Sequence, residues 1–386
     1  HNIWCAVIAD FTFRNSLSSN SYGDGKMARV DFDKFLEIAV KCKASDLHLK
    51  AESPPLLRIQ GEIVPLKQMP PLSAMQVKQM ALSIMDEKQY NKFTETMGVD
   101  VGYEIPHLAR FRTHIFQQRE MMGIVTRIIP FTIPTIEDLG IPTVCTNLCS
   151  RPRGLIVITG SAGCGKSTTQ SALIDYINQK FSHHIITIED PIEFVHTCKE
   201  SLINQRELGR DTYSFSEALK HVFREDPDVI LIGEMRDLET ISLAVTAAET
   251  GHLVLGTLHT TDTISTIDRI IDVFPPHQQQ QVRMQLTVNL VGISSQLLVK
   301  KADGSGRIAA FEILVATPAV RSLIREAKTY QIASVLQTGK KQGMMSMDQS
   351  LAQLVHQHIV TYEDALNVSI NPREFKQLVG ELDIRR

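Results

Sequence analysis

Glycines, one lysine and three hydroxyl residues are closely spaced near the middle of this 386-residue chain. They form the pattern Gly-x-x-x-x-Gly-Lys-Ser, between an expected strand, Leu155–Thr159, and an expected helix, Thr169–Ile177. Glycine lets the main chain approach a polyphosphate, whose oxygens successive N–H groups and the positive end of the helix then bind. We therefore predict a loop that binds a nucleoside triphosphate, formed by Gly160, Ser161, Ala162, Gly163, Cys164, Gly165, Lys166, Ser167 and Thr168.

Two side chains of this loop have a specific expected chemistry. Lys166 is expected to reach the β- and γ-phosphates, and the hydroxyl of Ser167 is expected to ligate Mg²⁺. A chance glycine-rich turn is the alternative, which the agreement of both flanking elements disfavours. The loop itself does not select adenine over guanine.

An acid follows a second apolar strand in Asp228-Val-Ile-Leu-Ile-Gly-Glu234. Many nucleoside triphosphatases have Asp at the end of this strand for the metal, whereas this chain has Gly233. Glu234 is therefore expected to hold a water of the Mg²⁺ shell or to orient the attacking water, and a second acid is needed. An ordinary capping or surface glutamate is the alternative.

The segment Thr187–Glu193 supplies further acids after another apolar strand. Carboxyl ends of parallel strands meet at one edge of an open α/β sheet, where ligands bind. We predict Glu193 as the general base or water-positioning residue, with Glu189 and Asp190 in metal-binding or supporting roles. A solvated acidic turn is the alternative.

Histidines and arginines complete the candidate site. His259 follows the expected strand Leu253–Leu258, where it could sense the γ-phosphate or contact a neighbouring subunit, although a structural histidine is the alternative. His252 precedes this strand, and its role is left open. Arginine can stabilise the charge that develops in phosphoryl transfer, often from another subunit. The candidates on strands of the first domain are Arg110, Arg112 and Arg127, with exposed structural arginines as the alternative.

Two patterns of elements divide the chain. Residues 27–130 combine short strands with amphipathic helices, including Asp31–Val40 and a helix capped by Ser73, and indicate a small α+β domain. Prolines mark a linker at residues 131–142. In residues 143–386, longer apolar strands alternate with helices such as Ser216–Arg224, capped at Ser216, which predicts a covered parallel sheet with a mainly helical tail from Thr317. Residues 1–26 are predicted to be a disordered leader or a non-native extension.

Composition limits the class of protein. The net charge is −3, which gives no field for non-specific nucleic-acid binding. No segment reaches the roughly 18 apolar residues that can span a bilayer, so no transmembrane segment is expected. The six cysteines contain no C-x-x-C pair and are expected to be buried free thiols in a reducing cytosol.

Together these motifs resemble those of the PilT-type retraction ATPases of bacterial type IV pili, within the wider secretion-ATPase superfamily. The resemblance covers residues 28–375 and rests on four segments in order: residues 160–168, 188–194, 232–237 and 248–259. It implies a PAS-like N-terminal domain followed by a RecA-like P-loop ATPase domain, and a homohexameric ring. It also implies ATP bound between the two domains, with Arg112 and Arg127 reaching it across a subunit boundary.

A C-terminal segment resembles the motif that the family ties to retraction, with departures at Val320 and Ser322. By spacing alone it is an amphipathic helix with Ala319, Leu323 and Ile324 buried. The tetracysteine insert of pilus-extension ATPases is absent from the sequence. Cys164 replaces the usual serine of the phosphate loop, and we expect activity to survive with some sensitivity to oxidation. The candidate residues of the C-terminal motif are Ala319, Arg321, Leu323, Arg325 and Glu326.

The resemblance implies a cytoplasmic, Mg²⁺-dependent ATPase peripheral to the inner face of the cytoplasmic membrane, which drives pilus retraction and twitching motility. Its implied partners are an inner-membrane platform protein and a second retraction ATPase, with no nucleic acid. An accessory ATPase of the PilU kind and a type II secretion or pilus-assembly ATPase are alternatives within the class. Alternatives from other classes are a RecA-like DNA motor and a nucleotide-gated scaffold that binds ATP without turnover.

Overall fold

The computed structural model describes residues 25–59, 61–106, 108–129 and 132–383. The chain divides after Thr132 into two compact units, which are described separately. Residues 1–24 of the predicted leader lie outside the described residues. The predicted boundaries of the two domains and of the linker stay predictions.

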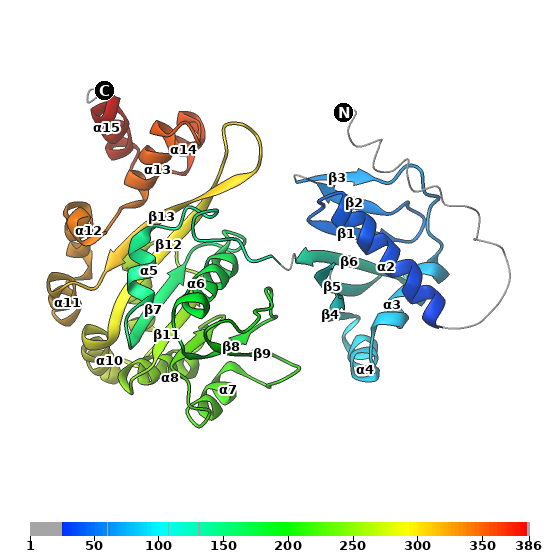
Figure 1. Cartoon of the computed structure of the whole chain (residues 1–386), viewed down its shortest axis with the longest axis horizontal. Helices are drawn as coiled ribbons and strands as arrows, with labels where there is room; N and C mark the ends of the chain where they lie inside the picture. Colours follow the sequence, from blue (N-terminus) through cyan, green and yellow to red (C-terminus); the bar gives the residue numbers. More distant parts are fainter. Residues whose placement is uncertain (1–24, 60, 107, 130–131, 384–386) are drawn as a thin grey trace. The chain divides into compact units, whose positions relative to one another are not determined.

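The first unit contains an antiparallel six-stranded sheet in the order β3-β2-β1-β6-β5-β4 (Figure 1). The strands are β1 (Asp46–Lys50), β2 (Leu56–Ile59), β3 (Glu62–Pro65), β4 (Gly98–Ile105), β5 (Ala109–Gln118) and β6 (Met121–Ile129). Its helices are α2 (Gly25–Lys41), α3 (Ala74–Ile84) and α4 (Glu87–Thr96). Helices α2 and α3 cover one face of the sheet, and their apolar sides form a core with alternate strand residues such as Leu47, Phe111 and Ile115.

The second unit contains a seven-stranded sheet in the order β13-β12-β7-β11-β10-β8-β9, in which only the β12–β13 pair is antiparallel. The strands are β7 (Gly154–Thr159), β8 (His184–Glu189), β9 (Leu202–Glu207), β10 (Val229–Ile232), β11 (Leu253–Leu258), β12 (Leu290–Lys300) and β13 (Arg307–Val315). Alternate residues of the central strands belong to two different cores, one on each face, as Ile156 and Val157 do. This explains why the central strands read as continuous apolar runs.

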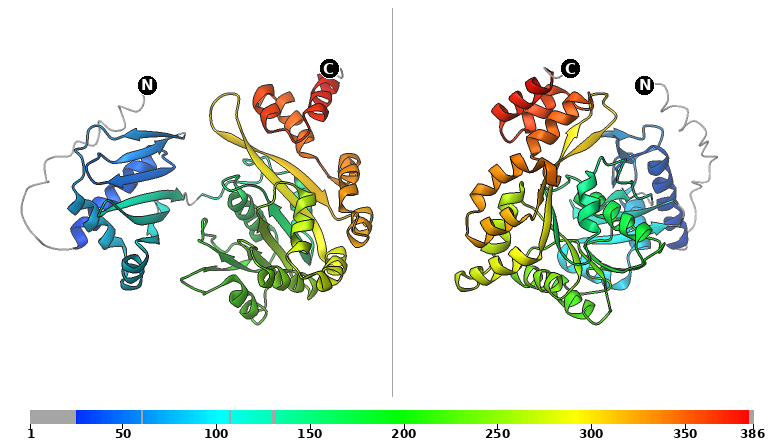
Figure 2. Two further views of the ribbon diagram at one scale, coloured as in Figure 1. Left: turned by 180° about the vertical axis from the view of Figure 1, so that it is seen from behind. Right: turned by 60° about the vertical axis from the view of Figure 1, so that its left-hand side comes forward.

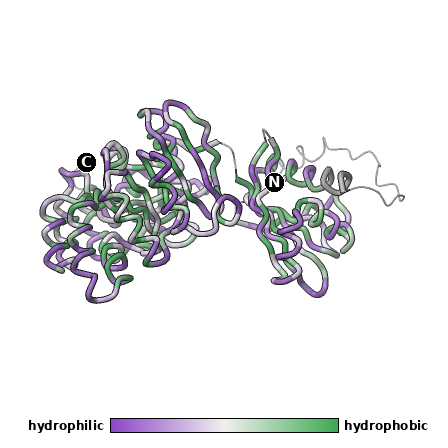
Figure 3. The backbone as a smooth tube through the Cα atoms, turned by 90° about the horizontal axis from the view of Figure 1, so that it is seen from below, coloured by the Kyte–Doolittle hydropathy of each residue, from purple (hydrophilic) through white to green (hydrophobic). Residues whose placement is uncertain are grey.

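Helices cover both faces of this sheet. Helices α5 (Thr143–Cys149) and α6 (Lys166–Lys180) pack on one face. The other core includes α7 (Phe215–Val222), α8 (Leu238–Glu249), α9 (Thr263–Asp272), α10 (Pro276–Asn289), α11 (Pro318–Arg325) and α12 (Ile332–Thr338). Polar stretches lie mainly at the outer loops (Figure 3).

The chain ends in three helices with a core of their own, α13 (Met347–His356), α14 (Tyr362–Val368) and α15 (Pro372–Asp383). They gather beside the hairpin end of β12 and β13 (Figure 2). The buried carboxylate of Asp348 on α13 binds the segment between α14 and α15, because it accepts hydrogen bonds from the N–H groups of Ile370, at 3.1 Å, and Asn371, at 2.8 Å. Among the described residues, every helix is too short or too polar to cross a bilayer.

The predicted α/β fold class is confirmed, and three details of the predictions are wrong. Helix α7 is capped by Ser214, whose extended backbone lets Oγ accept from the N–H of Glu217 at 3.1 Å, whereas Ser216 lies inside the first turn. Helix α6 begins at Lys166 rather than Thr169. Cys198 is exposed because it lies on a surface loop, whereas the other described cysteines are buried; Cys5 lies outside the described residues.

The position of the α7 cap can be tested by two serine substitutions. Ser214→Ala removes the acceptor for the Glu217 N–H and should lower the free energy of unfolding of the second unit by about 1 kcal/mol. Ser216→Ala, the comparison variant, removes a half-buried hydroxyl that lies 3.2 Å from Oγ of Ser214, and it should cost less because the N–H of Glu217 keeps its acceptor. Denaturant unfolding measures both, and a larger loss with Ser216→Ala would contradict the assignment.

Candidate functional site

The glycine-rich loop turns sharply between β7 and α6 because three of its glycines have positive φ angles. These angles are +143° at Gly160, +76° at Gly163 and +89° at Gly165. Gly160 also lies tightly against strand β12: a Cβ there would be 2.3 Å from the carbonyl oxygen of Gln296 and 2.6 Å from Sγ of Cys164. Only glycine fits both the backbone angle and the space at Gly160.

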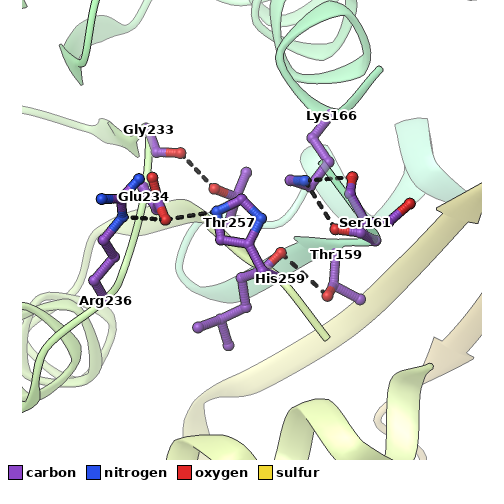
Figure 4. A network of polar contacts seen from close by, with 10 residues as sticks. Thr159, Ser161, Lys166, Gly233, Glu234, Arg236, Thr257 and His259 are labelled. Atoms are coloured by element: carbon purple, nitrogen blue, oxygen red, sulfur yellow. Dashed lines mark hydrogen bonds and ion pairs between the residues drawn. The ribbon is translucent and has the colours of Figure 1, made fainter. Parts of the chain in front are cut away.

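The end of α6 faces this loop as an anion-binding site. Gly165 is the N-cap and contributes no side-chain hydrogen bond, so a phosphate can take the place of a capping side chain. Lys166 is buried, and its Nζ donates to the carbonyl oxygens of Gly160, at 2.8 Å, and Ser161, at 3.0 Å (Figure 4). The lysine therefore folds over the loop, where phosphate oxygens can replace these two carbonyls.

The acid after β10 is held by two basic side chains (Figure 4). Oε1 of Glu234 accepts from Nε of Arg236 and, at 2.5 Å, from Nε2 of His259. Burial acts to raise the pKa of Glu234, but Arg236 and His259 together outweigh it and lower the pKa below its ordinary value. Glu234 is therefore ionised at neutral pH and is ready to accept hydrogen bonds from a water.

The strand order brings these groups to one edge of the sheet. Strand β11 lies between β7 and β10, with Thr159 opposite Leu258 and Ile232 opposite Gly256. The hydroxyl of Thr159 donates to the carbonyl oxygen of Thr260 at 2.7 Å, which joins the start of the phosphate loop to the segment after His259. The loop, Glu234 and His259 thus share the carboxyl edge, where ligands bind in such sheets.

Gly233 replaces the usual strand-end aspartate for a steric reason. A Cβ at Gly233 would lie 3.0 Å from the carbonyl oxygen of Ile188 and 3.2 Å from Cα of Glu189. The neighbouring strand β8 therefore leaves little room for a side chain at this position. Acids follow the end of this neighbouring strand, where they could supply the missing carboxylate.

Glu189 ends β8 in a buried position. Its Oε1 accepts from Oγ1 of Thr187 at 2.7 Å and from Nε2 of Gln205 at 3.0 Å. Burial raises the pKa of Glu189 to about 7, against the lowering effect of these two hydrogen bonds. Asp190 is exposed and Glu193 is half-buried in the loop that follows.

Other predicted residues lie elsewhere or have structural contacts. His252 stands at the opposite end of β11 from His259, where its Nδ1 donates to the carbonyl oxygen of Ala247 at 3.0 Å and closes the C-terminus of α8. The structure does not bring His252 to the edge that holds the phosphate loop.

The predicted arginines lie on strands of the first unit and are exposed to different degrees. By strand alternation, the row of β5 that contains Arg110 and Arg112 faces away from α2 and α3, as does Arg127 of β6. The side chain of Arg112 is 42% exposed and lies 4.0 Å from Asp100. The side chain of Arg127 is 69% exposed and pairs with Asp46 at 3.1 Å.

The C-terminal motif residues lie on α11 and divide between packing and surface. Val320 and Ile324 are buried, Leu323 is half-buried against the core and Ala319 is exposed, so the burial predicted from spacing is correct for Ile324 and wrong for Ala319. Arg325 and Glu326 are exposed and hydrogen-bond the hydroxyl of Ser322.

Arg321 has a structural role. Its guanidinium donates to the carbonyl oxygens of Val288, at 2.7 Å, and of Leu290 and Ala316, each at 2.8 Å, and also to that of Thr287. It thereby satisfies the last carbonyls of α10 and fixes α11 to it.

Three side chains near the site were not found from the sequence. Arg236 gave a weak signal as the second residue after Glu234. Gln205 and Gln296 lie on β9 and β12, which the apolar pattern did not predict. The amide of Gln296 donates to the carbonyl oxygen of Cys164 at 2.8 Å and holds the back of the phosphate loop.

The chain is similar to known proteins in both sequence and structure. The family model described as "Type II/IV secretion system protein" matches residues 124–367. The "Type IV pilus retractation ATPase PilT" of Pseudomonas aeruginosa is 49% identical over 346 residues, which cover 90% of this chain and 100% of the relative. The "Type IV pilus ATPase PilU" of the same organism is 41% identical over 337 residues, which cover 87% and 88%. The crystal structure of the pilus retraction motor PilT with bound ADP matches with a TM-score of 0.82 at 48% identity, covering 89% of this chain and 98% of that one.

The close packing at Gly160 predicts how the loop responds to an added methyl group. Gly160→Ala should raise the Kd for ATP on the order of 100-fold, because both the φ angle and the β12 contact become unfavourable. Gly163→Ala, where nothing lies within 4 Å, should raise it only about 10-fold, through the φ angle alone. Titration with a fluorescent ATP analogue measures both constants, and equal losses would contradict the β12 contact.

The raised pKa of Glu189 predicts a pH dependence of stability. Between pH 4.5 and pH 7 the folded chain binds a proton at Glu189 that the unfolded chain has released, so stability falls as pH rises. Glu189→Gln should abolish this pH dependence. The free energy of unfolding of the variant minus that of the wild type should therefore increase by up to about 3 kcal/mol from pH 4.5 to pH 7. Denaturant unfolding at several pH values provides the measurement, and a constant difference would refute the buried, protonated carboxyl.

Proposed function

The chain belongs to the type II/IV secretion system protein family, and we propose that it is an ATP-hydrolysing motor that drives the retraction of type IV pili. The resemblance inferred from the four sequence motifs is confirmed, and the chain is a P-loop ATPase of this family. The observation that carries the function is the single sheet edge holding the phosphate loop, Lys166 and Glu234, in a chain similar over 90% of its length to a pilus retraction ATPase. The higher identity to PilT than to PilU favours the retraction motor over the accessory ATPase.

The loop and Lys166 bind the nucleotide phosphates. Lys166 exchanges the carbonyl oxygens of Gly160 and Ser161 for oxygens of the β- and γ-phosphates. The first N–H groups of α6 and the positive end of this 15-residue helix add to the binding of negative charge.

Mg²⁺ fits the oxygen donors of this edge. The described part of the chain has no group of three or more His, Cys, Asp or Glu residues placed to hold a metal by themselves. Ser167, together with phosphate oxygens and waters, would hold Mg²⁺, with Glu234 and Asp190 hydrogen-bonding its waters. When bound, the ion neutralises charge on the phosphate oxygens.

The acids orient the attacking water. Glu193 acts as the general base, and its position on the half-buried loop after β8 supplies the carboxylate that Gly233 cannot. Glu234 remains ionised and accepts a hydrogen bond from His259. Loss of the γ-phosphate can therefore alter the hydrogen bonding of both side chains.

The motor works as a homohexamer in which the site is completed by arginines of the first unit. Arg112 and Arg127 lie on the sheet face opposite the described helices α2 and α3; Arg112 is partly exposed and Arg127 largely exposed. Arginine supplied by a neighbouring subunit is a recurrent device in phosphoryl transfer. ATP favours a closed arrangement of the two units, and loss of the γ-phosphate releases it. The resulting movement acts on a platform protein of the inner membrane. The ring lies at the cytoplasmic face of this membrane, alone or beside a second retraction ATPase.

Turnover of the purified chain tests the site. Lys166→Ala should abolish ATP binding, whereas Glu193→Ala and Glu234→Ala should bind ATP but lower kcat by about 100-fold or more, since each removes a group that handles the attacking water. Release of inorganic phosphate with ATP and Mg²⁺ gives the rates. Glu200→Ala, on an exposed residue of the same loop as Glu193, is the matched control and should keep the wild-type rate.

Undiminished turnover in both acid variants would refute the proposed chemistry, and ATP binding without turnover in the wild type would favour a scaffold. DNA is added in a parallel reaction, and strong stimulation of ATP hydrolysis would favour a DNA motor.

Retraction is measured as twitching motility in cells that lack their own retraction ATPase. Arg325→Ala, exposed on α11, should hydrolyse ATP normally but restore little movement, which would support the C-terminal motif.

A further inference from the structure

The loop that carries Glu193 has no helix or strand of its own. Residues 190–201 connect β8 to β9, and their main-chain N–H and C=O groups need partners outside regular structure. Side chains of neighbouring elements supply these partners. Glu207 accepts from the N–H of Ile192 at 3.2 Å, and Asn178 binds the far part of the loop at Thr197 and Lys199.

The amide of Gln205 on β9 holds the part of this loop next to Glu193. Its Nε2 donates to the carbonyl oxygen of Phe194 at 2.9 Å and to Oε1 of Glu189 at 3.0 Å. Its Oε1 accepts from the N–H of His196 at 2.7 Å. Both N–H groups and the carbonyl of the side chain are thus used, which is nearly the full capacity of an amide.

These contacts lie on both sides of Glu193 in the sequence. Glu189 precedes Glu193, and its carboxylate also accepts a hydrogen bond from the main chain of Glu193. Phe194 and His196 follow. Since Gln205 lies opposite Thr187 in the β8–β9 register, it reaches the same face of the sheet as Glu189. One amide therefore links the start and the end of the turn that bears Glu193.

We propose that Gln205 is a positioning residue, which fixes the turn around Glu193 and so directs the Glu193 carboxylate toward the attacking water. This inference rests on the proposed function of Glu193 as the general base. Glutamine suits the position because it supplies two donors and an acceptor in one plane. Glutamate of the same size would lose both donors and place a second acid beside Glu189.

The test compares steady-state hydrolysis in three single-substitution variants. Gln205→Leu and the nearly isosteric Gln205→Glu should lower kcat by on the order of 10- to 100-fold, while the KM and the Kd for ATP change less than about twofold, since the phosphate loop is untouched. Asn178→Ala is the matched control: it removes hydrogen bonds from the far part of the same loop and should keep the wild-type kcat. Thermal unfolding confirms that each variant is folded.

A double-substitution cycle separates positioning from general loosening. If Gln205 acts through Glu193, then Gln205→Leu should lower kcat by less than about threefold when Glu193→Gln is already present. An equal loss in both backgrounds, or a loss of ATP affinity in place of kcat, would overturn the proposal.

The roles of Glu193 and of Gln205 are distinguished by two results. Wild-type turnover in Glu193→Gln alone would remove the proposed role of Glu193 and the positioning role with it. Slow turnover in Glu193→Gln together with wild-type turnover in Gln205→Leu would overturn only the role of Gln205.

Discussion

The site depends on the close approach of main chains at two glycines. Strands buried on both faces pack so tightly that Gly160 meets the backbone of β12 and Gly233 meets the backbone of β8. The first contact fixes the turn of the phosphate loop. The second leaves little room for a side chain at the end of β10, and we propose that the loop after the neighbouring strand β8 supplies the carboxylate. The arrangement of acids is thus a consequence of packing.

The sequence predicted the parts of this site that apolar strands position. β7, β10 and β11 read as continuous apolar runs, and their shared carboxyl edge placed Lys166, Glu234 and His259 together. Strand β12 was missed because its buried centre is polar, with Ser294, Ser295 and Gln296. The cap of α7 was misplaced because two serines stand two residues apart, and only the backbone angles distinguish them.

Several residues of types that often occur in active sites have structural contacts in this chain. His252 closes the C-terminus of α8, and Arg321 binds the last carbonyls of α10. Both positions place a proton donor against the negative end of a helix, where a donor is favourable. Residue type alone therefore did not distinguish these structural residues from the side chains that lie at the edge with the phosphate loop.

The hydrogen bonds between Lys166 and its own loop have a thermodynamic consequence. Because the ammonium already donates to two carbonyl oxygens, the loop is a competing ligand for its own lysine. Nucleotide binding exchanges partners and does not create them, so part of the gross affinity is cancelled. The same exchange runs backwards when product leaves, and no bare charge is then left buried. A loop that competes with the nucleotide for Lys166 lowers the affinity for the nucleotide and speeds its dissociation. This suits an ATPase, which has to release ADP in every catalytic cycle.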